Sequence, residues 1–326
     1  MKRKVIVLLL FFILPVALVA KVSTYPIKVN ALNQQTFPKS VPAGNYSGIV
    51  HISDNLYGIV NDKSPVDGYY VFKIDIDSVQ GKINNVEFVR FVVSGMSNRD
   101  EEGIAFRTSD STIYISGESD NVILQYALDG RPTGRSLAIP QIYKTIAPNS
   151  GFESLTYNDS TRTFWIANEC PLSIDGQPAS PTNKVQNLIR IQSFNDSLQP
   201  GQHIIYRMDV PEAKSSAANY AMGVSEMLAL DDGSLLVLER EFYVPSSKLG
   251  SFVNCKLYQI KPETEGKNLV CQFKTSLSLF NYKIANYEGM CLGPKLKNGK
   301  QTIIMVSDSQ NQYAGVLHDW FKVLTF

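Results

Sequence analysis

The sequence predicts an all-β protein, a β-propeller of four-stranded blades. From residue 46 onward, short apolar or alternating runs are separated by Asp, Asn, Gly, Ser and Pro, the pattern of many strands and few helices. One phrase also recurs: an acidic residue opens an apolar run, a turn follows, and a second apolar run closes on another acid. Units of about 50 to 70 residues repeated around an axis are typical of a propeller. Counting copies predicts five blades, with a sixth open if 170–184 or 262–287 hide strands.

The two ends of the chain are expected to meet in one blade. Each of the first four units offers about four strands; in the fourth we expect the first two at 227–230 and 235–239. The last unit stops one strand short. The extended segment 24–32 can supply that strand and close the ring. A pair of β-sandwiches is the rival fold, but it does not predict the recurring acid.

The recurring acids are expected to gather at one mouth of the central channel. The first two strands of a unit are antiparallel neighbours, so the start of one lies beside the end of the next. This pairs Glu102 with Glu118, Glu153 with Glu169, Glu226 with Glu239 or Glu241, and Glu288 with Asp308. A fifth copy has Ser47 in place of the opening glutamate and ends on Asp62. The predicted ring therefore consists of Glu102, Glu118, Glu153, Glu169, Glu226, Glu239, Glu288, Asp308 and Asp62.

Crowded carboxylates either take up protons or bind cations. Oxygen ligands at flexible spacing suit Ca²⁺ best, with Mg²⁺ or Mn²⁺ behind it, so the sequence predicts a calcium site. The chain has three His residues, which makes a His-rich zinc site a poor fit. The alternative is structural, with each acid accepting backbone N–H bonds from the loop of the next blade.

Two arginines are candidates to hold a substrate. Arg240 lies between Glu239 and Glu241, and Arg99 comes shortly before Glu102. A guanidinium beside metal-bound carboxylates can grip a phosphate or carboxylate group bidentately. The alternative is that each arginine forms an ion pair with the neighbouring glutamates. No nucleophile elbow, P-loop or metalloprotease motif occurs, so catalytic residues cannot be named from the sequence.

Residues 1–20 are predicted to be a secretory signal, which leaves 21–326 as a single domain. Lys2, Arg3 and Lys4 form a basic region, an apolar stretch follows, and the segment ends on Ala20. An uncleaved anchor is the alternative, although about 16 apolar residues are short for a span of about 20. We expect a secreted or periplasmic, monomeric protein with no stable membrane span after cleavage.

The net charge and the cysteines indicate which partners and which cross-links to expect. The formal net charge is +1 with no basic run, which argues against a nucleic-acid partner. Cys255 and Cys271 flank a predicted hairpin symmetrically, so a cross-strand disulfide and two free thiols both remain open.

The motifs resemble those of the phytase-like family, the group described as "esterase-like activity of phytase". That family has E-G openings and a blade ending in L-h-V-L-E-R, where h is hydrophobic. The matching stretches here are 102–105, 153–155, 225–230, 235–240 and 288–290. The resemblance implies a propeller, export, and a Ca²⁺-dependent phosphoesterase. Ser47 and Ser154 depart from the pattern and would leave the metal cluster less complete.

The leading hypothesis is therefore an exported propeller that binds Ca²⁺ through the acidic ring and hydrolyses a phosphoester or another small-molecule substrate. One alternative is a non-catalytic binding propeller whose acids are structural or hold a stabilising ion. Another is a Ca²⁺-dependent lactonase-type hydrolase, since Asn61 and Asn168 stand next to ring acids.

Overall fold

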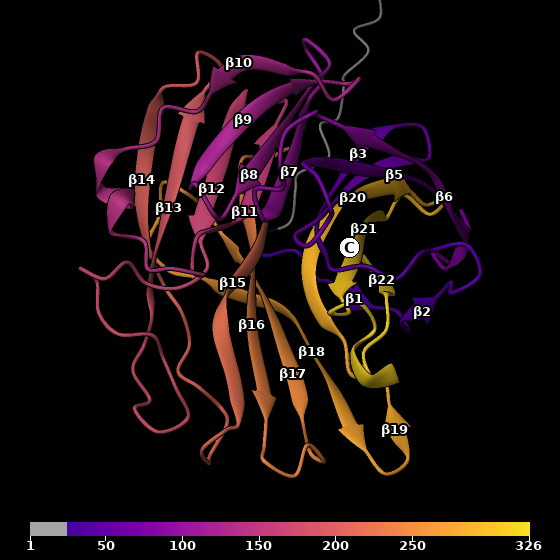
Figure 1. Cartoon of the computed structure of the whole chain (residues 1–326), viewed down its shortest axis with the longest axis vertical. Coiled ribbons are helices and arrows are strands. Elements are labelled where there is room, and N and C mark those ends of the chain that lie inside the picture. The colour runs from indigo at the N-terminus through magenta and orange to yellow at the C-terminus, as the bar shows by residue number, and fades with distance from the viewer. Residues whose placement is uncertain (1–24) are drawn as a thin grey trace, which may run out of the picture.

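Five antiparallel sheets are arranged in a ring about a central axis (Figure 1), and in a propeller this axis is the channel that the blades surround. The computed structural model describes residues 25–326, apart from the side chain of Asn281. The predicted signal at 1–20 lies outside these residues. Two short 3-10 segments, η1 (Gln141–Thr145) and η2 (Tyr313–Gly315), are the helical elements of the described chain. No helix within it is long and apolar enough to cross a membrane.

Blades 1 to 4 each contain four consecutive strands, and in blade 3 the second and third strands are joined by the long segment 169–187. Blade 1 is β3 (Tyr46–Ser53), β4 (Leu56–Asn61), β5 (Gly68–Ile76) and β6 (Ile83–Val93). Blade 2 is β7 (Glu101–Arg107), β8 (Thr112–Gly117), β9 (Val122–Ala127) and β10 (Pro132–Ser136). Blade 3 is β11 (Phe152–Asn158), β12 (Thr163–Asn168), β13 (Leu188–Asn195) and β14 (Pro200–Arg207). Blade 4 is β15 (Asn219–Ala229), β16 (Leu235–Val244), β17 (Phe252–Ile260) and β18 (Asn268–Ser278), with β19 (Asn281–Tyr282) added at its edge.

The fifth blade joins the two ends of the chain, as predicted. Its strands β20 (Asn286–Lys295), β21 (Gln301–Asp308) and β22 (Trp320–Thr325) are completed by β1 (Asn30–Ala31), which pairs antiparallel with β22. The short strand β2 (Gln35–Thr36) pairs with β22 as well. Five blades are therefore confirmed. There is no sixth, because 170–184 contains no strand and 262–287 supplies β18, β19 and the start of β20.

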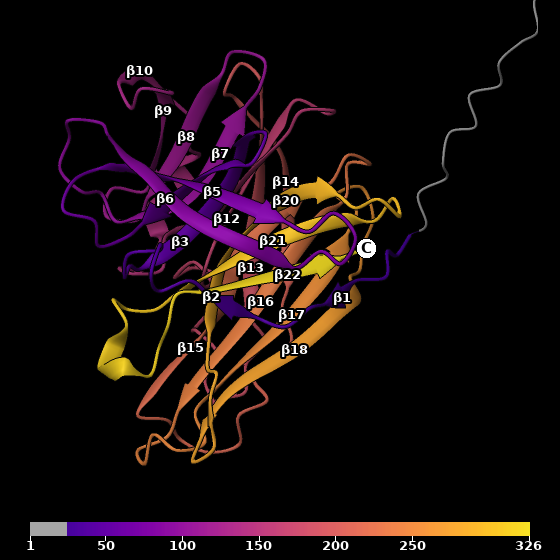
Figure 2. The same ribbon diagram turned by 90° about the vertical axis from the view of Figure 1, so that its right-hand side faces the viewer.

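Blade 4 is longer than its sequence indicates. Its first two strands begin at Asn219 and end at Val244, well beyond the predicted 227–230 and 235–239. The prediction stopped where Glu239, Arg240 and Glu241 interrupt the apolar run, but the backbone ladder continues through them. The extra length makes this blade project from the ring in both ribbon views (Figures 1 and 2).

The core lies between adjacent blades. Between blades 2 and 3, for example, Tyr114, Phe152 and Phe164 are almost wholly buried in one cluster. Truncating such a phenylalanine to alanine costs about 3–5 kcal/mol, because a cavity is left in addition to the lost burial. The innermost strands β3, β7, β11, β15 and β20 thus hold their mouth-facing ends in fixed positions around the channel.

Candidate metal centre

Every blade has a β-bulge at the start of its innermost strand, and in three of the five blades the bulge residue is the opening acid of the repeat. In blade 3, Phe152 pairs with Asn168 and Ser154 with Ala167, so Glu153 is the extra residue. The ladders of the other blades shift register at the same point. A bulge bends the strand and re-aims the side chain that it carries. The bulge residues of the five blades, in order, are Ser47, Glu102, Glu153, Ser225 and Glu288.

A second set of equivalent positions lies next to the bulges, at or just after the mouth-facing part of the second strand of each blade. The N–H of Glu118 donates to the carbonyl of Asp100, and that of Glu169 donates to the carbonyl of Gly151. Arg240 pairs with Gly223 in the same place of blade 4. The five equivalent positions are Asp62, Glu118, Glu169, Arg240 and Asp308. Blade 4 therefore supplies a serine and an arginine where blades 2, 3 and 5 supply two acids.

Crowding explains why glycine follows the bulge residue in three blades. A Cβ on Gly103 would lie 2.8 Å from Cβ of Leu155 in the next blade. A Cβ on Gly289 would lie 2.3 Å from the backbone oxygen of Ser47. The innermost strands approach so closely that a side chain there would clash. The E-G motif thus combines a mouth-facing acid with a contact between blades.

Glu226 is placed away from the mouth. It occupies the position of those glycines, one residue beyond the bulge residue Ser225. Burial raises the pKa of its carboxyl well above the usual range, and backbone N–H groups of Met227, Met290 and Leu155 oppose that rise. Glu226 thus accepts hydrogen bonds from the backbone of its own blade and of blades 3 and 5. The alignment of S-E-M-L with the other openings was one residue out of register.

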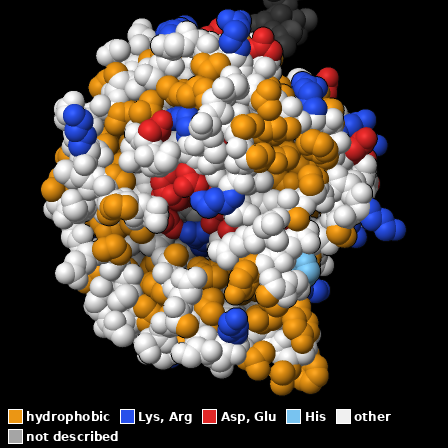
Figure 3. Space-filling view, viewed as in Figure 1, with side chains coloured by type: hydrophobic (Ala, Val, Ile, Leu, Met, Phe, Trp, Pro, Cys, Tyr) orange, Lys and Arg blue, Asp and Glu red, His pale blue; other side chains and the backbone are white. Residues whose placement is uncertain are grey.

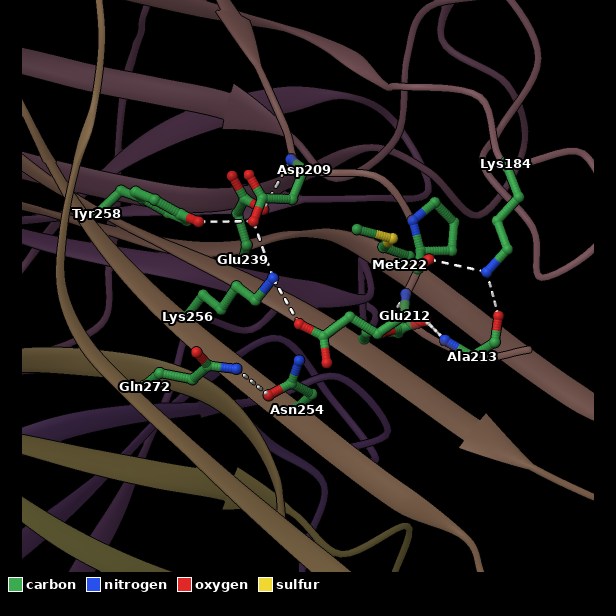
Figure 4. Close-up of polar contacts among 12 residues, drawn as sticks. Lys184, Asp209, Glu212, Ala213, Met222, Glu239, Asn254, Lys256, Tyr258 and Gln272 are labelled. Carbon is green, nitrogen blue, oxygen red and sulfur yellow. Dashed lines mark hydrogen bonds and ion pairs between the residues drawn. The ribbon is translucent and has the colours of Figure 1, made fainter.

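Glu239 also lies outside the mouth, on the opposite face of β16 from Arg240. Its carboxylate accepts hydrogen bonds from the Tyr206 hydroxyl at 2.6 Å and from the Asp209 N–H at 3.1 Å, and it pairs with Lys267 at 2.5 Å. Glu241, on that same face, accepts the N–H groups of Glu212 and Ala213. Figure 4 shows part of this network between blades 3 and 4. Glu239 and Glu241 therefore have the structural role given above as the alternative, in which an acid accepts backbone N–H bonds at a contact between blades.

Arg99 does not face the channel. Its guanidinium forms a bidentate pair with Asp120 at 2.8 and 2.9 Å and also donates to the Tyr126 hydroxyl and the Val122 carbonyl. These four hydrogen bonds leave the Arg99 guanidinium little capacity to hold a substrate. For Arg99, the structure agrees with the ion-pair alternative, although the partner is an aspartate from the same blade.

Arg240 does lie at the mouth, and it is buried against the acids. It forms ion pairs with Glu169 and Glu288 and donates to the Asn286 side chain at 3.0 Å. Its Nε has no hydrogen-bond partner in the described chain. This one guanidinium compensates part of the negative charge of the ring.

The remaining acids are crowded enough to disturb one another. Burial, followed by the charges of Asp62, Glu288 and Glu118, raises the pKa of Glu102 well above its usual range. Burial and the neighbouring glutamates do the same for Glu153. Burial also raises the pKa of Asp308 to about 6. The carboxylates at the mouth therefore repel one another, and bound protons or a cation would reduce this repulsion.

Two residues that were absent from the predicted ring complete the mouth. Lys63 forms ion pairs with Asp62 and Asp100, and its side chain remains 61% exposed. Asp100 has a left-handed backbone (φ 60°), which Asp tolerates better than most residues. Its place directly before Glu101-Glu102 was the available signal, but the antiparallel pairing used for the prediction did not involve it.

The donor set fits a hard cation. One oxygen each from Asp62, Asp100 and Glu102 lie within 4.8 Å of one another. The buried Oδ1 of Asp62 has no hydrogen-bond partner in the described chain, although its other oxygen contacts Lys63. Carboxylate oxygens around a space of this size are the ligands that Ca²⁺ prefers. Figure 3 shows the acids gathered at the centre of the face, with basic side chains beside them.

The thiols do not form the disulfide that remained open. Cys255 lies opposite Phe273 and Cys271 opposite Leu257, so the two cysteines are diagonal rather than directly paired. All four cysteines are free.

Comparison with known families identifies the chain. The family model described as "Phytase-like: Esterase-like activity of phytase" matches residues 41–310. The chain belongs to the phytase-like family. The matched region contains every phytase-like motif noted in the sequence and the whole acidic mouth. No curated protein sequence matches the chain.

Solved structures resemble this phytase-like chain only distantly. An endo-arabinase from Bacteroides thetaiotaomicron is 12% identical with a TM-score of 0.48, covering 88% of this chain and 94% of its own. A luciferin-regenerating enzyme is 9% identical with a TM-score of 0.45, covering 91% and 95%. A streptogramin B lyase is 13% identical with a TM-score of 0.39, covering 90% and 97%. At these scores the likenesses carry no argument about function.

Proposed function

We propose that this chain is an exported, Ca²⁺-dependent phosphoester hydrolase that acts at the acidic mouth of its channel. The observation that carries the proposal is the excess of buried and partly buried carboxylates over cations at that mouth. Arg240 and Lys63 compensate only part of the charge of Asp62, Asp100, Glu102, Glu118, Glu153, Glu169, Glu288 and Asp308. Membership of the phytase-like family supports the same chemistry.

The residues divide into two tasks. Asp62, Asp100 and Glu102 would hold one Ca²⁺, and the neighbouring acids offer further oxygen ligands. Bound Ca²⁺ would supply positive charge that polarises a phosphoryl oxygen and activates a water molecule. The unpartnered Nε of Arg240 is a donor placed among these acids, so Arg240 remains the candidate to orient the substrate.

Turnover of p-nitrophenyl phosphate and phytate tests the proposal. The chain without residues 1–20 should release phosphate only when Ca²⁺ is present. Asp62→Asn should lower the rate at least tenfold, because the variant loses an anionic ligand. Asp129→Asn, at an exposed turn outside the mouth, is the matched control. Background rates from a folded, calcium-loaded chain would contradict the enzyme proposal.

A non-catalytic binding propeller is the second candidate, and Arg240 favours it. A guanidinium already occupies one of the five equivalent positions and ties two acids together. In this case Ca²⁺ would stabilise the ring without catalysing hydrolysis. A large rise in Tm with Ca²⁺, together with no turnover of any phosphoester, would favour this candidate.

A further inference from the structure

The far end of blade 4 exposes a group of large apolar side chains. Leu279 and Phe280 form the two-residue turn between β18 and β19, where Ser278 pairs with Asn281. Phe280 is 97% exposed, Leu279 is 65% exposed, and Tyr282 follows at 55%. Exposing such groups to water is unfavourable, so several of them on one turn indicate an interaction site.

One further connection is hydrogen-bonded beside this turn, and a second one contacts that connection. The loop that carries Leu249 is attached beside the turn, because the N–H of Gly250 donates to the carbonyl of Leu277. Lys248 of the same loop lies 5.8 Å from the ring centroid of Tyr313, which belongs to the β21–β22 connection. We call the exposed residues Leu249, Leu279, Phe280, Tyr282 and Tyr313 the blade 4 tip. Figure 1 labels β19 at the lower right of the molecule, and Figure 3 shows hydrophobic side chains gathered at that end from the same direction.

The segments that form the tip carry basic residues but no acidic ones. Segments 245–251 and 277–285 contain Lys248 and Lys283 and neither Asp nor Glu. The acid of the third connection, Asp319, is buried and accepts hydrogen bonds from Gly44, Ser309 and Gln312. The whole chain is balanced, with 31 basic and 30 acidic residues. The combination of apolar and basic residues is therefore a local property of this end.

We propose that the blade 4 tip docks on a lipid bilayer with anionic headgroups. Phe280 and Leu279 would enter the boundary between headgroups and acyl chains, the tyrosines would lie at the interface, and the lysines would face the lipid phosphates. A protein partner fits less well, because stable interfaces bury about 800 Å² on each side and this turn is narrow and protruding. Strand β16 connects the acidic mouth with the tip. Arg240 of this strand lies at the mouth, and the strand ends at Val244, directly before the loop that carries Leu249.

Vesicle sedimentation tests the docking proposal. The chain without residues 1–20 is mixed at low salt with vesicles of phosphatidylcholine alone or of phosphatidylcholine with anionic phosphatidylglycerol, whose negative surface potential attracts basic segments. Binding is expected with the anionic vesicles and should weaken with salt. The double variant Leu279→Ser/Phe280→Ser should bind at least tenfold more weakly. The Lys248→Glu/Lys283→Glu variant should lose the preference for anionic vesicles.

Val79→Ser is the matched control, because Val79 is an exposed apolar residue at the β5–β6 turn. It should bind as the parent does. A Phe280→Trp variant adds a direct readout, since its emission should shift to shorter wavelength on vesicles if the tip inserts. The proposal is overturned if the parent does not sediment with anionic vesicles, or if the double variant and Val79→Ser bind equally well. It is also overturned if the tip variants abolish self-association of the chain while leaving vesicle binding unchanged.

Discussion

Neighbouring residues of β16 belong to two acidic regions with opposite chemistry. Glu239 faces the interface between blades 3 and 4, where Lys267, Tyr206 and the Asp209 backbone satisfy its carboxylate. Arg240 faces the channel mouth, where carboxylates outnumber their partners and their pKa values rise. At the interface, the nearby lysines instead lower the pKa of Asp209 below its ordinary value.

The difference shows that an acid's role depends on which face of its strand it occupies. Interface acids are paired and stabilise the contact between blades. Mouth acids have too few cationic partners and repel one another. A bound cation would remove this repulsion, and the free energy gained would contribute to its affinity. Neutralising an acid should therefore stabilise the fold at the mouth and destabilise it at the interface.

The largest effect is expected for Arg240→Met in calcium-free buffer. Removing the guanidinium leaves Glu169 and Glu288 buried without their partner, which should lower the free energy of unfolding by about 3–5 kcal/mol. Added Ca²⁺ should restore much of the loss. Urea unfolding measures both values. Arg190→Met, which breaks the Arg190–Asp175 pair outside the mouth, should show a smaller loss that Ca²⁺ does not restore. Equal behaviour of the two variants would contradict the distinction.

Stability should fall as pH rises from about 4 to 8 without calcium. The folded pKa of Asp308 is about 6, above its ordinary value of 3.8, so the folded state favours the protonated form. Its contribution is fully present below the unfolded pKa and is lost as pH rises through the folded value, which corresponds to about 3 kcal/mol. Burial raises the pKa of Glu101 to about 8, so this second carboxyl extends the decline. In a plot of stability against pH, Asp308→Asn should flatten the lower part of the decline and Glu101→Gln the upper part. Unchanged slopes in both variants would contradict the assignment of the decline to these two carboxyls.

The comparison is sharpest for a matched pair of substitutions. At pH 7 without calcium, Glu153→Gln should stabilise the fold by about 1–3 kcal/mol, because the folded state no longer has to protonate a carboxyl whose pKa burial raises. Glu239→Gln should destabilise it by about 1.5–3 kcal/mol, since it weakens charge-assisted hydrogen bonds. Thermal unfolding of both variants gives the two signs. The same sign for both would refute the opposition between the regions.

The smallest stability effect is expected for Lys63→Met. Its ion pairs with Asp62 and Asp100 are exposed, so their loss should change stability by less than about 1 kcal/mol. Calcium affinity should rise several-fold, because an ammonium no longer competes for these oxygens. Calcium titration checks this point, and Lys144→Met is a control at a distant exposed lysine. Weaker calcium binding in Lys63→Met would argue against a site between these two acids.

Much of the architecture could be predicted from the sequence. The recurring phrase was sufficient for five four-stranded blades, for the closure by the N-terminal strand, and for the placing of Glu102, Glu153 and Glu288 at one mouth. The same reasoning failed in blade 4, where Glu226 was aligned with those acids although Ser225 is the bulge residue. A bulge shifts the register by one residue, and a single sequence does not show which residue is extra.

Other features depended on contacts that the sequence does not contain. Strict alternation along β16 would have put Glu239 and Arg240 on opposite faces, and the prediction did not apply it. The partners of Arg99 and the position of Lys63 follow from packing between strands that are distant in the sequence. The tip of blade 4 was also missed, because Phe280 reads as an ordinary apolar residue until its exposure is known.

Isothermal titration of the calcium-free chain with Ca²⁺ tests the central claim most directly. The account predicts saturable binding for the parent chain and for Glu239→Gln, and at least tenfold weaker binding for Asp62→Asn and Glu102→Gln. At a calcium concentration of 100 times Kd, the parent should also gain about 2.7 kcal/mol of stability. No saturable heat from the folded parent, or equal affinity in all four proteins, would contradict a calcium site at the channel mouth.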